Sequence, residues 1–158
     1  MTTILSSQIL LTIAILTAGV IYGTDMFHAI AGKRATELSK DSSIADLLGH
    51  THLIADKRMP AIGITSVVST ALCTALNYNY LTIACLSGGA LVMLLIHLAL
   101  YLTIAKPINA LMSEAAVKNR VPENIRALQR RWESVIYYRA GLLLLAMLML
   151  ILAVDSLH

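Results

Sequence analysis

The sequence predicts an all-α protein with a single domain, residues 1–158, folded as a four-transmembrane-helix bundle. Of its 158 residues, 58% are hydrophobic and only 13% are charged, whereas a soluble domain is about a quarter charged. Aromatic residues make up only 5%, so aliphatic residues supply the apolar excess, which favours long helices over a β-barrel with aromatic girdles. A net charge of only +3 in so apolar a chain argues against a nucleic-acid-binding protein.

The first helix is predicted at about residues 4–28. Residues 1–24 carry no charged side chain, and about 20 apolar residues suffice to cross a bilayer. The stretch has neither the basic start nor the small-residue cleavage site of a signal peptide, so we expect it to be a retained helix.

Helices two and three are predicted at about residues 52–76 and 81–105. Residues 59–105 are uncharged over 47 positions, which as one helix would measure about 70 Å against a hydrocarbon core of about 30 Å. Asparagine and tyrosine alternate at positions 77–80, which indicates a turn at the membrane interface. The long stretch is therefore a helical hairpin.

Helix four is predicted at about residues 130–154, with Trp132 near the membrane interface. The apolar run 140–154 is short alone and becomes long enough if the helix begins near Arg130. Upstream, Lys106-Pro107 is expected to end helix three, and Asn109 to cap a short helix over residues 110–118.

The basic residues predict the orientation. All twelve Lys and Arg lie within residues 33–58 and 106–139, and the other connection and both termini have none. By the positive-inside rule, two longer connections face the cytoplasm and both termini face outside, which is an N-out/C-out topology.

The two cysteines, Cys73 and Cys85, lie inside apolar stretches without the spacing of a redox or zinc motif. We expect both to be small buried residues. Neither a disulfide framework nor a zinc site is predicted.

Ionisable residues within the spans are predicted to meet near the inner end of the bundle. Such residues are costly in a bilayer and mark either a functional site or a structural ion pair. At about 1.5 Å per residue, Asp25, Asp56, His97 and Arg139 lie at similar depths, about 22–31 Å below the outer ends. His28 shares a helical face with Asp25, and His52 shares one with Asp56. Tyr101 lies one turn below His97.

Histidines and carboxylates from several helices are typical of a buried metal site and can also act as acid and base. The candidate metal ligands are Asp25, His28, His52, Asp56 and His97. If a metal is bound, we expect iron or copper, and otherwise no cofactor. The structural alternatives are an interhelical hydrogen bond for His97, an ion pair between a carboxylate and Arg139, and capping of helix two by His50 and His52.

Four short motifs carry a family resemblance. They are Gly19-x-x-x-Gly23-Thr24-Asp25-x-Phe27, Gly49-x-x-His52-x-x-x-Asp56-x-Arg58-x-Pro60, Lys106-Pro107-Ile108-Asn109, and Trp132 followed by Arg139. Together they resemble the anthrone oxygenase-like family of small four-helix membrane proteins, over nearly the whole chain. The family's Pro-x-Asn and Trp…Arg would be Pro107, Asn109, Trp132 and Arg139, whereas Ile136 replaces a residue that is commonly polar. The resemblance implies a bacterial inner-membrane protein, with oxygenation of an electron-rich polycyclic phenol in some members.

Three functions follow from these patterns. The first is an integral membrane oxidoreductase or oxygenase acting on a small aromatic or phenolic substrate, with His52, His97 and Arg139 as catalytic residues and Tyr101, Asn109 and Trp132 binding substrate. Without a metal, His52 or His97 would be the base, and the resulting carbanion or phenolate would react with dioxygen. The second is a non-catalytic accessory or binding subunit of a larger membrane complex. The third is a small transporter, in which two copies could form the path.

Overall fold

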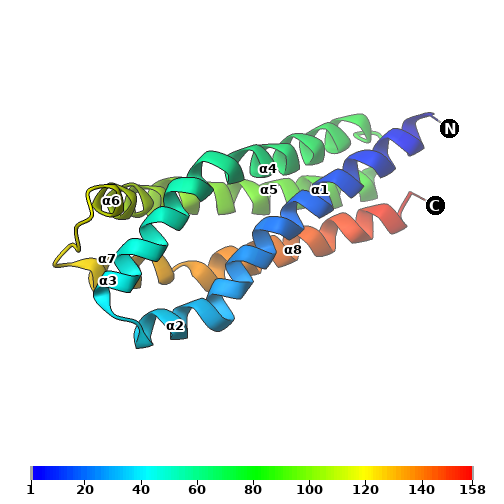
Figure 1. Cartoon of the computed structure of the whole chain (residues 1–158). Coiled ribbons are helices and arrows are strands. Elements are labelled where there is room, and N and C mark those ends of the chain that lie inside the picture. The colour runs from blue at the N-terminus through cyan, green and yellow to red at the C-terminus, as the bar shows by residue number, and fades with distance from the viewer. Residues whose placement is uncertain (1, 158) are drawn as a thin grey trace.

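The computed structural model describes residues 2–157 of the chain, so Met1 and His158 lie outside it. Across those residues the chain forms helices and turns and no strand. Four long helical rods make up the molecule (Figure 1), and each is long and apolar enough to cross a membrane. The predicted all-α bundle of four transmembrane helices is therefore confirmed.

Each rod consists of consecutive helical elements. The first contains α1 (Thr2–Phe27), the π-helical turn η1 (His28–Gly32) and α2 (Lys33–Leu38). The second contains α3 (Asp41–Ser43), the π-helical turn η2 (Ile44–Leu48) and α4 (Gly49–Leu76). The third contains α5 (Leu81–Leu100), the π-helical turn η3 (Tyr101–Ala105) and α6 (Lys106–Val117). The fourth contains α7 (Ile125–Glu133) and α8 (Ile136–Asp155).

The rods close into a ring. Helix α1 packs against α4 and α8, and α5 packs against the same two helices. The N- and C-terminal ends lie together at one end of the bundle, while α2, α3, α6 and α7 gather at the other (Figure 1). The loops and helix ends that carry most of the basic residues therefore share one end, here called the basic end.

Two clusters of buried apolar residues form the core. In the membrane-spanning half, alanines such as Ala14, Ala90 and Ala146 lie between the helices beside larger residues such as Leu143, because small residues let membrane helices approach closely. At the basic end, Met112, Ile125 and Ile136 belong to the second cluster. This second core holds the helical extensions against one another.

The two long connections predicted between the helices are mostly helical. Only residues 39–40 interrupt the first, and residues 118–124 the second. Ile44, Met112 and Ile125 are nearly inaccessible, so these segments bury apolar faces and form amphipathic extensions of the rods.

Pro107 does not end the third rod, contrary to the prediction. The backbone N–H of Lys106 bonds to the carbonyl of Tyr101, which widens the turn before the proline, and Pro107 falls in the first turn of α6. A proline costs no intrahelical hydrogen bond in that position. Asn109 is therefore a buried residue within α6 and not a cap, and α6 is turned away from the direction of α5 (Figure 1).

Helix four is not continuous, because residues 134–135 separate α7 from α8. No glycine or proline stands there, so the sequence gives no signal for the break. The hairpin at residues 77–80 is confirmed, and Asn77 secures it by donating to Ser7 Oγ at 2.8 Å. Cys73 is buried as predicted, but the prediction for Cys85 was wrong, since this residue faces outward from α5.

Candidate functional site

A buried charge pair joins the first and last rods. Arg139 on α8 donates from one terminal nitrogen to Asp25 Oδ1 on α1 at 2.9 Å. His97 on α5 adds a third group, with its Nε2 3.3 Å from Asp25 Oδ2. All three residues are at most 8% exposed. The structure thus brings together three of the predicted residues from three helices, at the shared depth that helical rise predicts.

The Nε2 atom of His97 has two competing neighbours. It lies 3.5 Å from Arg139 Nε, which can only donate, and 3.3 Å from Asp25, whose carboxylate can only accept. A single ring nitrogen either accepts or donates. The tautomer of His97 therefore decides which neighbour it bonds.

Asp56 on α4 forms a separate polar group. Its Oδ1 accepts a hydrogen bond from the Tyr101 hydroxyl and another from Asn109 Nδ2, each at 2.9 Å. These donors come from η3 and α6. The side chains of Tyr101 and Asn109, which the sequence predicted to bind substrate, are therefore both hydrogen-bonded to Asp56.

Trp132 connects the polar groups. Its ring meets that of His28 edge-on at 4.6 Å between centroids and that of His52 at 5.4 Å. The guanidinium carbon of Arg139 lies 5.5 Å from the centroid of the same ring. Trp132 is buried within the bundle, so its ring packs against the neighbouring helices.

Glu133, Gln129 and Thr36 complete the region, and sequence reasoning missed them. Glu133 Oε1 accepts from Gln129 Nε2 at 2.7 Å and lies 3.0 Å from the Thr36 hydroxyl. It also lies 3.5 Å from His28 Nε2. Positions 129, 132 and 133 share one helical face, but a helix predicted to begin at residue 130 left Gln129 in a connection. A search for an amphipathic helix before Trp132 could have found them.

Two π-helical turns begin at residues of this region. His28 is the first residue of η1 and Tyr101 the first of η3, and such turns are frequent at functional sites. Gly32 has a direct role here, because a Cβ at this position would lie 2.6 Å from His28 Nδ1. Glycine thus leaves the space that the His28 ring occupies.

Five buried polar atoms in the described part of the chain have no hydrogen-bond partner, and all five belong to this region. They are His52 Nε2, Asn109 Oδ1, Gln129 Oε1, Trp132 Nε1 and one terminal nitrogen of Arg139. Buried polar groups without partners are destabilising and therefore rare. Two of the five can only donate, two are acceptors, and the imidazole can do either. We call these five residues and the Asp25–His97–Arg139 group the polar centre.

The five predicted metal ligands do not form a ligand set. Asp25 and His97 contact each other, Asp56 is held by Tyr101 and Asn109, and His28 and His52 each contact the Trp132 ring. Among the residues that the structure describes, no three His, Cys, Asp or Glu side chains are arranged to bind a metal ion. The expectation of iron or copper gains no support from this arrangement.

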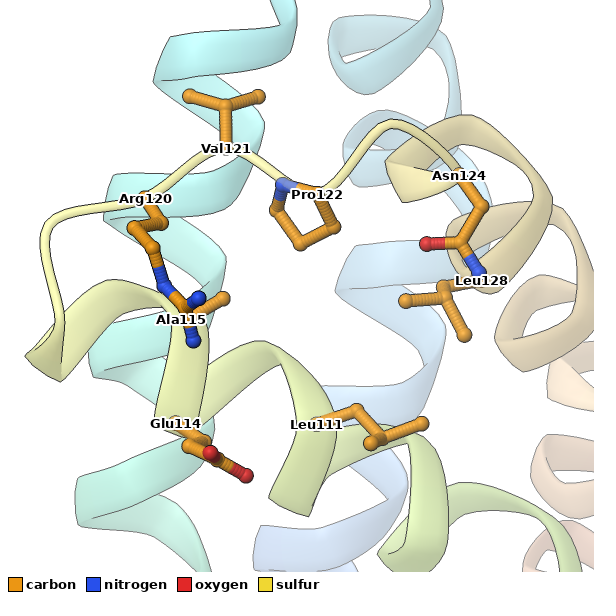
Figure 2. A pocket seen from close by; sticks show the side chains of 8 residues that line it. All are labelled: Leu111, Glu114, Ala115, Arg120, Val121, Pro122, Asn124 and Leu128. Atoms are coloured by element: carbon orange, nitrogen blue, oxygen red, sulfur yellow. The ribbon is translucent and has the colours of Figure 1, made fainter.

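A surface pocket of about 340 Å³ is lined by residues of α6, α7 and the loop that joins them. In Figure 2, Leu111 of α6 and Leu128 of α7 flank the pocket, and the loop carrying Arg120 and Pro122 runs across it. None of the residues lining it belongs to the polar centre.

No family model matches this chain, and neither a curated protein nor a solved structure matches it.

Proposed function

We propose that this chain is an integral membrane oxygenase that removes a proton from a small aromatic or phenolic substrate and lets the resulting anion react with dioxygen. The observation that carries the proposal is the set of five unpartnered polar atoms gathered around Trp132. A substrate with an acidic oxygen and a hydroxyl group offers both kinds of partner that these atoms lack. We also propose that the basic end faces the cytoplasm of a bacterial inner membrane.

Arg139 is the residue suited to hold the substrate anion. One of its terminal nitrogens is occupied by Asp25, and the other is buried without an acceptor. A fixed donor in a water-poor site stabilises charge that develops on a substrate oxygen. The Trp132 N–H, also unpartnered, is a second donor.

His52 is better placed than His97 to be the base. Its Nε2 is buried and unpartnered, and its ring lies against Trp132. His97 Nε2, by contrast, is already within reach of Asp25 and Arg139. We therefore assign proton removal to His52 and a positioning role to His97, which orients the pair that holds Arg139.

The atoms and electrons of the proposed reaction balance for a substrate such as anthrone, in which a ring methylene lies between two aryl groups. Removal of one proton by His52 leaves a carbanion whose charge is shared with the carbonyl oxygen on the opposite side of the same ring, which Arg139 would hold. The carbanion transfers electrons to dioxygen and forms a carbon–oxygen bond, and the peroxide, once protonated, loses water to leave a ketone. One O₂ thus converts CH₂ into C=O and H₂O, and the step uses no metal.

Oxygen consumption tests the proposal with a matched pair of variants. Purified protein in detergent should consume one O₂ per anthrone and form one anthraquinone, faster than buffer alone. His52→Gln should reduce this catalysed rate at least about tenfold, since general-base catalysis contributes about 10²–10⁴. His50→Gln is the control, because His50 is exposed and bonds only within its own rod, to Asp46. Equal rates for wild type, both variants and buffer would refute the proposal.

A second candidate, a non-catalytic subunit of a membrane complex, is supported by the mutual pairing of Asp25 and Arg139. In that case the buried charges serve the architecture. The protein would then show no anthrone-dependent oxygen consumption, and it would be retained with another membrane protein after solubilisation.

A further inference from the structure

A second surface pocket, of about 470 Å³, lies at the basic end between α2 and α7. This volume is within the range of about 300–1,000 Å³ typical of small-molecule sites. All of its lining residues are charged or polar: Lys33, Thr36, Glu37, Arg126, Gln129, Arg130, Glu133 and Ser134. We call it the α2–α7 pocket.

The acidic groups of this pocket already have partners. Glu37 is bound by Arg34 at 2.7 Å, and Glu133 accepts from Gln129 at 2.7 Å. One basic group is also neutralised, because Arg126 Nε donates to Asp41 at 2.7 Å. The same guanidinium donates to the carbonyls of Thr36 and Ser39 and thereby fastens α7 to the end of the first rod.

Two cations in the pocket lack an acidic partner within the described part of the chain. Arg130 is exposed on α7. Lys33 places its ammonium 5.6 Å from the ring centroid of Tyr137. The pocket therefore presents uncompensated positive charge to whatever enters it.

The pocket lies next to side chains typical of the membrane interface. Tyr137 and Tyr138, in the first turn of α8, are 59% and 71% exposed. Exposed tyrosines of transmembrane helices concentrate at the level of the lipid headgroups. A cationic pocket at this level, on the side that carries the basic residues, has the chemistry that recognises anionic phospholipid headgroups.

We propose that the α2–α7 pocket binds the phosphate-bearing headgroup of an anionic phospholipid, with Lys33 and Arg130 contacting the phosphate. A bound headgroup would bridge α2 and α7, which belong to the first and last rods. Gln129 and Glu133 line the same pocket and contact His28, so the lipid would stabilise the junction beside the polar centre. This inference does not depend on the oxygenase proposal.

Thermal unfolding of the whole chain in mixed micelles tests it, with phosphatidylglycerol, phosphatidylcholine or inorganic phosphate as the probe. Phosphatidylglycerol should raise the melting temperature of the wild type more than phosphatidylcholine does. Lys33→Gln/Arg130→Gln should abolish this difference, whereas the control Lys57→Gln/Arg58→Gln, which removes two exposed charges outside the pocket, should keep it. The single variant Arg130→Gln, at an exposed position, should show a smaller difference between the two lipids than the wild type. This variant replaces the double variant in the test if the double variant does not fold.

Three outcomes would overturn the proposal. One is that phosphatidylglycerol raises the melting temperature of both double variants equally, which would indicate nonspecific attraction between basic residues and anionic lipid. Another is a shift of the same size with inorganic phosphate alone, which would indicate a site for free phosphate. The third is the absence of any difference between the two lipids in the wild type.

Discussion

Asp25 and Arg139 are 114 positions apart in sequence and form an ion pair of 2.9 Å across the interface between α1 and α8. Both side chains are almost completely buried. An isolated charge inside a membrane bundle is destabilising, and two opposite charges that meet there neutralise each other. The pair therefore ties the first rod to the last, and it leaves one Arg139 nitrogen available to a ligand.

Neutralising only Arg139 should destabilise the protein more than neutralising both Asp25 and Arg139. Arg139→Gln leaves the Asp25 carboxylate unpaired in the core and should lower the free energy of unfolding by about 3–5 kcal/mol, as for other buried pairs. Asp25→Asn/Arg139→Gln should lose less than Arg139→Gln alone, because no charge is stranded. Denaturant unfolding in detergent compares four proteins, namely the wild type, Asp25→Asn, Arg139→Gln and the double variant. Strictly additive losses would show that the two residues are not coupled.

His97→Ala should affect activity more than stability. An interhelical hydrogen bond in a membrane bundle contributes only about 0.6 kcal/mol on average, so the loss of this side chain's contacts to Asp25 and Arg139 should be small. If His97 positions the polar centre, the rate of anthrone-dependent oxygen consumption should fall severalfold. Unfolding and oxygen uptake are compared on the same preparation. If His97→Ala consumes oxygen at the wild-type rate, the proposed positioning role of His97 is refuted.

Gly49→Ala should destabilise the junction of α4 and α6. A Cβ at Gly49 would lie 2.6 Å from the backbone oxygen of Met112 and 2.5 Å from the Cβ of Ala116. Neither atom is the end of a flexible side chain, so the helices must separate, and such overpacking costs about 1–3 kcal/mol.

Gly23→Ala is the matched control for that substitution. A Cβ there would meet no described atom within 4 Å beyond the helix itself, and alanine is the better helix former. Its melting temperature should equal or exceed that of the wild type. If both variants lose the same stability, the close approach at Gly49 is not the cause.

Cysteine labelling tests the proposed topology. Ser43→Cys, at an exposed position of the basic end, is introduced after Cys73 and Cys85 are replaced by alanine. In intact cells it should resist a membrane-impermeant thiol reagent and react only after permeabilisation. Asn79→Cys, in the exposed hairpin at the opposite end, should react in intact cells. The reverse pattern would place the basic end outside.

The sequence by itself determined the number of membrane helices and the hairpin between the second and third. These features follow from uninterrupted apolar stretches and from turn-forming residues at positions 77–80, which act locally along the chain. It also determined which ionisable residues share a depth, because helical rise is constant. The shared depth of Asp25, His97 and Arg139 was therefore foreseeable.

Only the tertiary structure decided which of those residues touch. Rise along a helix gives depth but not rotation, so it could not show that Arg139 pairs with Asp25 and not with Asp56, or that Asp56 is held by Tyr101 and Asn109. The helical extensions at the basic end, and with them Gln129 and Glu133, depend on mutual burial of amphipathic faces from distant segments. Such burial exists only when the rods pack together, so a local sequence pattern could indicate an amphipathic helix before Trp132 but not which segments cover its apolar face.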